Sequence, residues 1–77
     1  MQAEVIVLFK RIRDLREDRD ITQQAMAKKL KIHQTTYSDY ELGKLNVPAD
    51  VLIKLAEFYD TSIDYIVGMT DNPKHNR

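Results

Sequence analysis

Four polar side chains share one side of a short predicted helix over residues 34–42, and their chemistry suits hydrogen bonding to the edges of DNA bases. They are Gln34, Thr35, Ser38 and Asp39. A glutamine amide can bond adenine through both of its groups, and serine or threonine hydroxyls can meet several bases. Tyr37 and Tyr40 project from the other side and are expected to face the interior. The pattern predicts a helix with one polar face for recognition and one aromatic face for packing.

The other reactive side chains form no catalytic or metal-binding pattern. The acidic residues between positions 14 and 20 alternate with Arg13, Arg16 and Arg19, so ordinary surface pairing accounts for them. No nucleophile stands beside a candidate base, and no glycine-rich loop could hold a phosphate. His33 and His75 have no further ligands at a zinc-binding spacing. We therefore expect no enzyme, no metal site and no cofactor.

The helix with the polar face is preceded by a second short helix, and both have clear ends. Thr22 can cap the earlier helix, because its hydroxyl can accept from amides of the first turn. That helix carries an apolar stripe up to Leu30, and the later helix ends at Gly43, a natural C-terminal stop. Two short helices joined by three or four residues form a helix-turn-helix, whose second helix enters the major groove. The motif is expected over residues 22–43.

Apolar spacing predicts three further helices. The first has apolar residues three and four positions apart: Val5, Leu8, Ile12 and Leu15. Residues 4–9 could instead form a short strand, but we favour the start of the helix. A fourth helix starts near Pro48, which is well tolerated in a first turn. Its buried stripe is Leu52, Leu55, Ala56 and Tyr59.

The fifth helix is expected over residues 63–67, with Thr61 or Ser62 as its cap and Gly68 as its end. Residues 70–77 lack apolar anchors and should fray. We therefore expect an all-α domain of five helices over residues 1–70, followed by a flexible C-terminal tail over residues 71–77.

The composition limits the chain to one small folded domain. Its 77 residues are 43% hydrophobic and 31% charged, which is ordinary for a globular protein. It has no cysteine, which excludes disulfides and fits a reducing cytoplasm. The longest apolar run, residues 5–9, is far shorter than the roughly 20 residues that cross a membrane. We expect a cytoplasmic protein without a signal peptide.

The charge balance argues against nucleic-acid binding, since the formal net charge is zero and a basic balance is usual for such proteins. Residues 22–46 are locally more basic, with four lysines against two acids. The lysines are Lys28, Lys29, Lys31 and Lys44. A lysine run is usually a solvated face, but phosphate contact depends on the local patch and not on the total charge. Nonspecific affinity for DNA should therefore be modest.

Three stretches of the chain resemble the phage-repressor/Cro family, also called the xenobiotic-response-element family. They are residues 13–17 (RDLRE), 21–30 (ITQQAMAKKL) and 37–44 (YSDYELGK). Pro48 with residues 52–56, and then residues 62–68, are similar to the fourth and fifth helices of that family. The resemblance covers roughly residues 8–68, and its specificity lies in the joint spacing over five helices. It implies a lambda-repressor-like DNA-binding domain.

The resemblance also implies roles for matching positions. Gln23 would bond a phosphate at the start of its helix, where the helix dipole is positive. Gln34, Thr35, Ser38 and Asp39 would face bases or adjacent phosphates. Lys44 would reach the DNA backbone. Arg16 would pair with Glu41, which ties the first helix to the recognition helix.

Three positions depart from the family pattern. Lys31 stands where glycine is usual in the turn, and a non-glycine residue in the left-handed conformation costs about 1 kcal/mol. The turn is therefore expected to be slightly reshaped. His33 replaces the usual serine or threonine cap of the recognition helix. Asp39 stands where a basic or neutral residue is commoner; it repels phosphates but can accept from a cytosine amine.

These observations predict a sequence-specific regulator of transcription, repressor-like, that binds double-stranded DNA as a homodimer. The alternative is a helix-turn-helix module that binds another protein, as an antitoxin or adaptor, with little DNA binding. The dimer would use apolar residues beyond those needed for the core: Ile53, Phe58, Tyr65 and Val67, with Val5 to Val7. No small-molecule ligand or membrane partner is expected.

Overall fold

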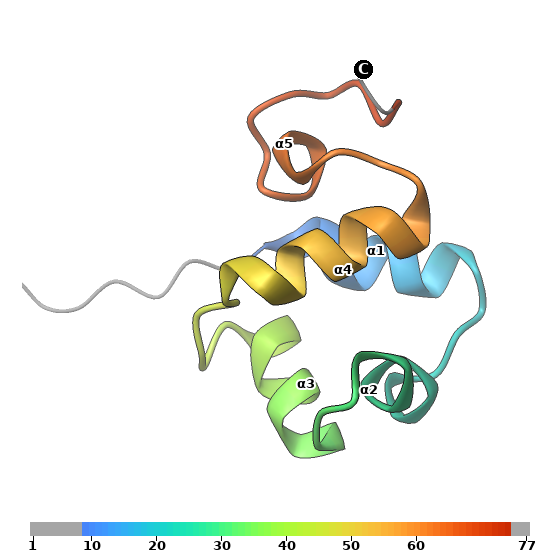
Figure 1. Cartoon of the computed structure of the whole chain (residues 1–77), viewed down its shortest axis with the longest axis vertical. Helices are drawn as coiled ribbons and strands as arrows, with labels where there is room; N and C mark the ends of the chain where they lie inside the picture. The colour runs from blue at the N-terminus through green and yellow to red at the C-terminus, as the bar shows by residue number, and fades with distance from the viewer. Residues whose placement is uncertain (1–8, 75–77) are drawn as a thin grey trace, which may run out of the picture.

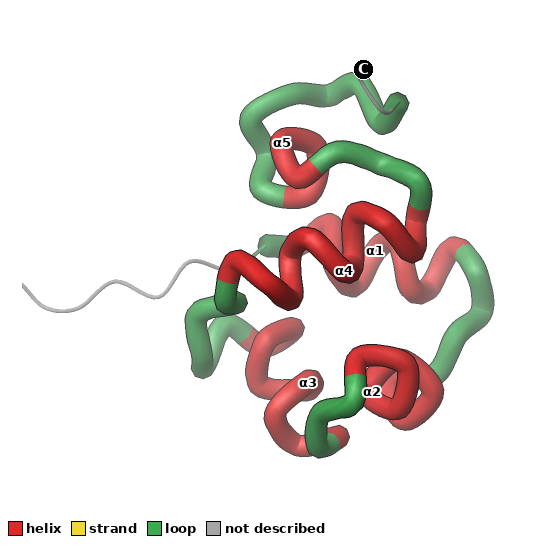
Figure 2. The backbone as a smooth tube through the Cα atoms, in the orientation of Figure 1, coloured by secondary structure: helices red, strands yellow, loops and turns green. Residues whose placement is uncertain are grey.

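The computed structural model describes residues 9–74, and within that range it contains five helices and no strand. The helices are α1 (Lys10–Asp18), α2 (Gln23–Leu30), α3 (Gln34–Leu42), α4 (Ala49–Tyr59) and α5 (Ile63–Ile66). Helices α2 and α3 lie at one end of the long axis, and α5 with the C-terminal segment lies at the other (Figure 1). Short loops join all five (Figure 2). The predicted all-α, five-helix fold is confirmed.

One apolar core holds the helices together, and each helix contributes to it. Ile12, Met26, Tyr37, Leu55 and Ile66 come from the five helices in turn, and each is at most 1% exposed. Around them, further side chains are buried or partly buried against this cluster. Because a short chain has little apolar area to bury, its stability depends on every helix meeting the same core.

Polar side chains cap two of the helices. The Thr22 hydroxyl accepts from the Ala25 amide at 3.0 Å, as predicted, and so begins α2. The Ser62 hydroxyl accepts from the Tyr65 amide at 3.0 Å and begins α5. Of the two caps considered for α5, Ser62 is therefore the one used. His33 precedes α3 without a side-chain capping bond.

The turn between α2 and α3 keeps a left-handed residue although no glycine is present. Lys31 has φ 59° and ψ 44°, and its amide still bonds to the Lys28 carbonyl at 3.2 Å. The expectation that the turn would be reshaped is therefore wrong. The backbone retains the left-handed conformation, and Lys31 bears the steric cost of about 1 kcal/mol.

Some helix boundaries differ from the prediction. Helix α1 begins at Lys10, and residues 1–8, which include Val5 and Leu8, lie outside the described part of the chain. The choice between helix and strand over residues 4–8 therefore stays open. Pro48 precedes α4 as its cap residue instead of lying in its first turn. Val51 is buried in α4, whereas Leu52 is only half-buried.

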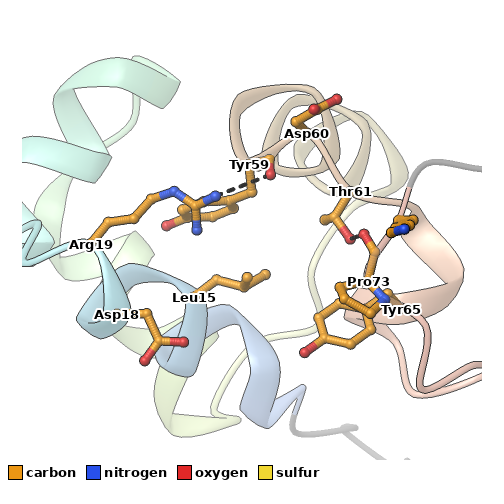
Figure 3. A pocket seen from close by; sticks show the side chains of 9 residues that line it. Leu15, Asp18, Arg19, Tyr59, Asp60, Thr61, Tyr65 and Pro73 are labelled. Carbon is orange, nitrogen blue, oxygen red and sulfur yellow. Dashed lines mark hydrogen bonds between the residues drawn. The ribbon is translucent and has the colours of Figure 1, made fainter.

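The segment that follows α5 is fixed to the domain by polar contacts. The Arg11 guanidinium donates to the carbonyls of Tyr65 at 2.8 Å and Thr70 at 2.6 Å, and it pairs with Asp71 at 2.7 Å. The Thr61 hydroxyl donates to the Pro73 carbonyl, beside a surface pocket between this segment, α1 and α4 (Figure 3). Residues 70–74 thus have anchors that a search for apolar residues misses. Residues 75–77 lie outside the described range, so the flexible tail stays a prediction for them.

None of the helices described is long and apolar enough to cross a membrane.

Candidate nucleic-acid interface

The outward side of α3 carries the four polar residues singled out from the sequence. Gln34 and Thr35 are exposed, and Ser38 and Asp39 are half-buried. Tyr37 and Tyr40 face the core, with 0% and 8% exposure. Thr35, Ser38 and Asp39, at spacings of three and four residues, therefore share one side of α3, and Gln34 is exposed in its first turn. All four lie at the end of the molecule formed by α2 and α3 (Figure 1).

A buried carboxylate fixes α3 against the first two helices. The Glu41 side chain is 2% exposed, and its Oε2 accepts from Arg16 Nε at 2.7 Å. Arg16 Nη2 donates to Oε1 of the same carboxylate at 3.1 Å, and Arg16 Nη1 donates to the Ile21 carbonyl at 2.7 Å. Arg16 thereby joins three elements: α1, α3 and the loop that precedes α2. The bidentate geometry is the one in which arginine and carboxylate fit best.

Two further side chains complete the hydrogen bonds of this carboxylate. The Tyr37 hydroxyl, one turn earlier on α3, donates to Glu41 Oε2. Gln23 Nε2, in the first turn of α2, donates to Glu41 Oε1 at 2.9 Å. A buried charge is tolerated when its oxygens are all hydrogen-bonded, as they are here. We call Arg16, Gln23, Tyr37 and Glu41 the Glu41 cluster.

The cluster shifts the pKa values of its members in ways that favour the ion pair. Burial raises the pKa of Glu41, but hydrogen bonds from Arg16, Tyr37 and Gln23 outweigh it, so the net pKa lies below the usual range. The hydrogen bond to Glu41 raises the pKa of Arg16. Burial, and then the bond to Glu41, raises the pKa of Tyr37. Both charges and the neutral phenol therefore persist at neutral pH.

Gln23 does not extend freely toward solvent as the phosphate role suggested. One N–H of its amide is held by Glu41. The start of α2 is also partly satisfied from within the domain, because the Ala25 amide bonds to the Thr22 hydroxyl. The structure thus shows Gln23 as a link between α2 and α3, and its phosphate contact stays a prediction.

The lysines around the motif do not all face the same way. Lys44 is exposed directly after Gly43, where its own amide bonds to the Asp39 carbonyl at 2.9 Å. Lys28 and Lys31 are also exposed. The Lys29 ammonium instead lies 5.2 Å from the centre of the Phe58 ring on α4. Lys29 is therefore turned toward α4 rather than toward the polar face.

A family model described as helix-turn-helix matches residues 12–66. The chain belongs to this helix-turn-helix family. The resemblance to phage-repressor/Cro domains is thereby confirmed. Within the matched residues, α2 and α3 are two short helices joined by residues 31–33.

Named relatives cover most of this chain. It is 41% identical over 63 residues to the uncharacterized HTH-type transcriptional regulator YobD of Bacillus subtilis. That match spans 82% of the chain and 56% of YobD. It is 35% identical over 69 residues to the HTH-type transcriptional regulator ImmR of the same organism, spanning 90% of the chain and 54% of ImmR. It is 37% identical over 58 residues to the cryptic phage CTXphi transcriptional repressor RstR of Vibrio cholerae, spanning 75% of the chain and 52% of RstR. The chain spans about half the length of these relatives.

Besides the Gln23–Glu41 bond, two features of α3 escaped the sequence analysis. The bond from Tyr37 to Glu41 was signalled by their four-residue spacing on one helix, which places them on the same face. Leu42 is 58% exposed on the outward side of α3, although a leucine at a helix end reads as part of the core. Its position seven residues after Thr35 was the available signal, because such residues share a helix face.

Removing Arg16 should destabilise the domain severely. The Arg16→Ala change would leave Glu41 charged and buried without its cation, at a cost of about 3–5 kcal/mol, which approaches the whole stability of a small domain. Thermal melting, monitored by circular dichroism, measures the loss of stability. The matched control is Arg13→Ala, whose pair with Glu17 is exposed on both sides and contributes about 0–1 kcal/mol. Equal melting temperatures for the two variants would contradict a buried ion pair.

The stability that Glu41 contributes should disappear in acid. Because the folded-state pKa lies below the ordinary value of 4.5, the contribution is complete above that value and is lost as the pH falls through the lower folded-state pKa. Wild type should therefore exceed Glu41→Gln in free energy of unfolding at neutral pH, and the difference should shrink in acid. Urea unfolding between about pH 7 and pH 3 measures it. For the exposed control Glu17→Gln, the difference from wild type in free energy of unfolding should stay small at every pH. A difference for Glu41→Gln that does not change with pH would refute the lowered pKa of Glu41.

Proposed function

We propose that this chain binds double-stranded DNA sequence-specifically and regulates transcription as a repressor-like protein. Its recognition helix α3 would lie in the major groove, with Gln34, Thr35, Ser38 and Asp39 toward the bases. The observation that carries the proposal is the polar outward face of α3, held in a fixed orientation to α2 by the Glu41 cluster. Family membership supports it, and so do the transcriptional regulators and the phage repressor among the relatives.

The remaining contacts would position the domain on the duplex. Lys44 would reach a phosphate from the end of α3, and the spare Gln23 N–H with the first amides of α2 would hold another at the positive end of that helix. Arg16 and Glu41 would act structurally, by holding α3 in register with α2. No step of this function requires a catalyst, metal or cofactor, and a DNA regulator of this kind would work in the cytoplasm.

We also propose a symmetric homodimer. One recognition helix covers few base pairs, and paired helices would reach half-sites about 34–36 Å apart. Of the residues expected at the interface, Ile53 is 47% and Phe58 39% exposed, whereas Tyr65 and Val67 are half-buried; Val5 to Val7 lie outside the described residues. Ile53 on α4 and Ile63 on α5 line one surface hollow. This α4–α5 surface is the one we propose for the partner copy.

Salt titration separates DNA recognition from the alternative of a protein-binding module. Lys44→Ala should weaken binding to every duplex and flatten the salt slope by about one unit, because a phosphate contact is lost. Gln34→Ala should weaken binding to a selected site by about 1–3 kcal/mol and leave a scrambled duplex nearly unaffected. Fluorescence anisotropy on both duplexes over a range of salt measures this. If wild type does not distinguish the two duplexes at any salt concentration, the DNA-binding proposal is wrong and the protein-binding alternative takes its place.

Self-association tests the dimer. Ile53→Lys places a charge in the proposed interface and should shift the protein toward monomers in sedimentation equilibrium. Leu45→Lys is the matched control, because Leu45 is similarly exposed, at 43%, but lies in the loop after α3. It should sediment as wild type. Monomeric wild type at high concentration, together with a footprint over one unrepeated half-site, would rule the dimer out.

A further inference from the structure

We propose that Leu42 contacts the methyl group of a thymine in the major groove and so selects for thymine at one position of the binding site. The inference rests on the proposed DNA-binding function and adds a specificity-determining residue to it. The juxtaposition that carries it is an exposed leucine on the same side of α3 as the polar recognition residues.

Leu42 has no structural task that would explain a leucine. It is 58% exposed, and it is absent both from the buried core and from the apolar side chains packed against that core. Its neighbours Tyr40 and Glu41 already fill the inward side of the last turn of α3. Among the described residues, the only large apolar side chain more exposed is Met69, which lies beyond α5.

The position of Leu42 continues the proposed recognition face. Thr35, Ser38, Asp39 and Leu42 stand at spacings of three, four and seven residues, which places them along one side of a helix. Seven residues of α-helix extend about 10 Å, which fits along a major groove that admits a helix. A helix lying along the groove would therefore bring both Thr35 and Leu42 to base edges, about three base steps apart.

The chemistry of the side chain selects one base. Leucine can neither donate nor accept a hydrogen bond, and of the four bases only thymine presents a methyl group in the major groove. Contact would remove apolar surface of both groups from water. One methyl-sized group contributes about fourfold to an equilibrium constant. The leucine that is unfavourable in free solution thus becomes favourable at a thymine.

The test combines one protein substitution with one change of base. A site is selected in vitro with wild type, and each of its thymines is replaced singly by deoxyuridine, which removes only the methyl group. At one position, wild type should bind the deoxyuridine duplex about fourfold more weakly. Leu42→Ala should bind the thymine and deoxyuridine duplexes at that position equally. Leu45→Ala, which removes another exposed leucine, should keep the wild-type ratio.

The outcomes separate this inference from the function on which it rests. Circular dichroism first establishes that both alanine variants are folded, as their exposure leads us to expect. If wild type prefers the selected site but no thymine shows a ratio that Leu42→Ala abolishes, the inference is wrong and the DNA-binding proposal stands. If Leu42→Ala instead changes the sedimentation of the protein and leaves every base ratio intact, Leu42 belongs to a protein contact. If wild type prefers no duplex, both proposals fail.

Discussion

The arrangement of the first three helices depends on one buried carboxylate. Apolar packing is non-directional, so a small core of this kind would tolerate several rotations of α3 on α2. The Glu41 charge would not, because it must keep its hydrogen bonds wherever it is buried. Arg16 from α1, Gln23 from α2 and Tyr37 from α3 each meet it at a fixed place. The polar face of α3 is therefore oriented by a charge on the opposite side of the same helix.

The same interaction connects stability with recognition. Gln23 lies in the first turn of α2 and bonds to Glu41, which lies in the last turn of α3. The start of one helix and the face of the other are thus fixed relative to each other through a single carboxylate. A DNA surface presents phosphates and base edges at set distances, and matching them requires such fixed geometry. Burying an ion pair contributes little net stability, whereas the orientation it specifies is what a recognition surface needs.

Local signals in the sequence predicted the local structure well. Thr22, Gly43 and Ser62 act within four residues of the helix ends that they mark, and the stripes of α2 and α3 repeat over single turns. The Arg16–Glu41 pair came from the family resemblance and not from spacing. The clasp of Arg11 on Thr70 joins residues 59 positions apart, and nothing local encodes it. The Gln23–Glu41 bond joins residues 18 positions apart on different helices, so no local pattern predicts it.

The zero net charge, which argued against DNA, has a different meaning once the pairs are located. Within residues 9–74, every ion pair uses an arginine of α1, namely Arg11, Arg13 or Arg16. The acid of the motif that lies inside the fold, Glu41, is neutralised by one of these. Lys28, Lys31 and Lys44 enter no ion pair in that range, and only Asp39 opposes them on the motif. The acids that bring the total to zero lie mostly after the motif, since residues 47–74 hold five acids and two lysines. Residues 22–46 therefore keep a positive balance, and the local balance is the quantity that phosphates experience.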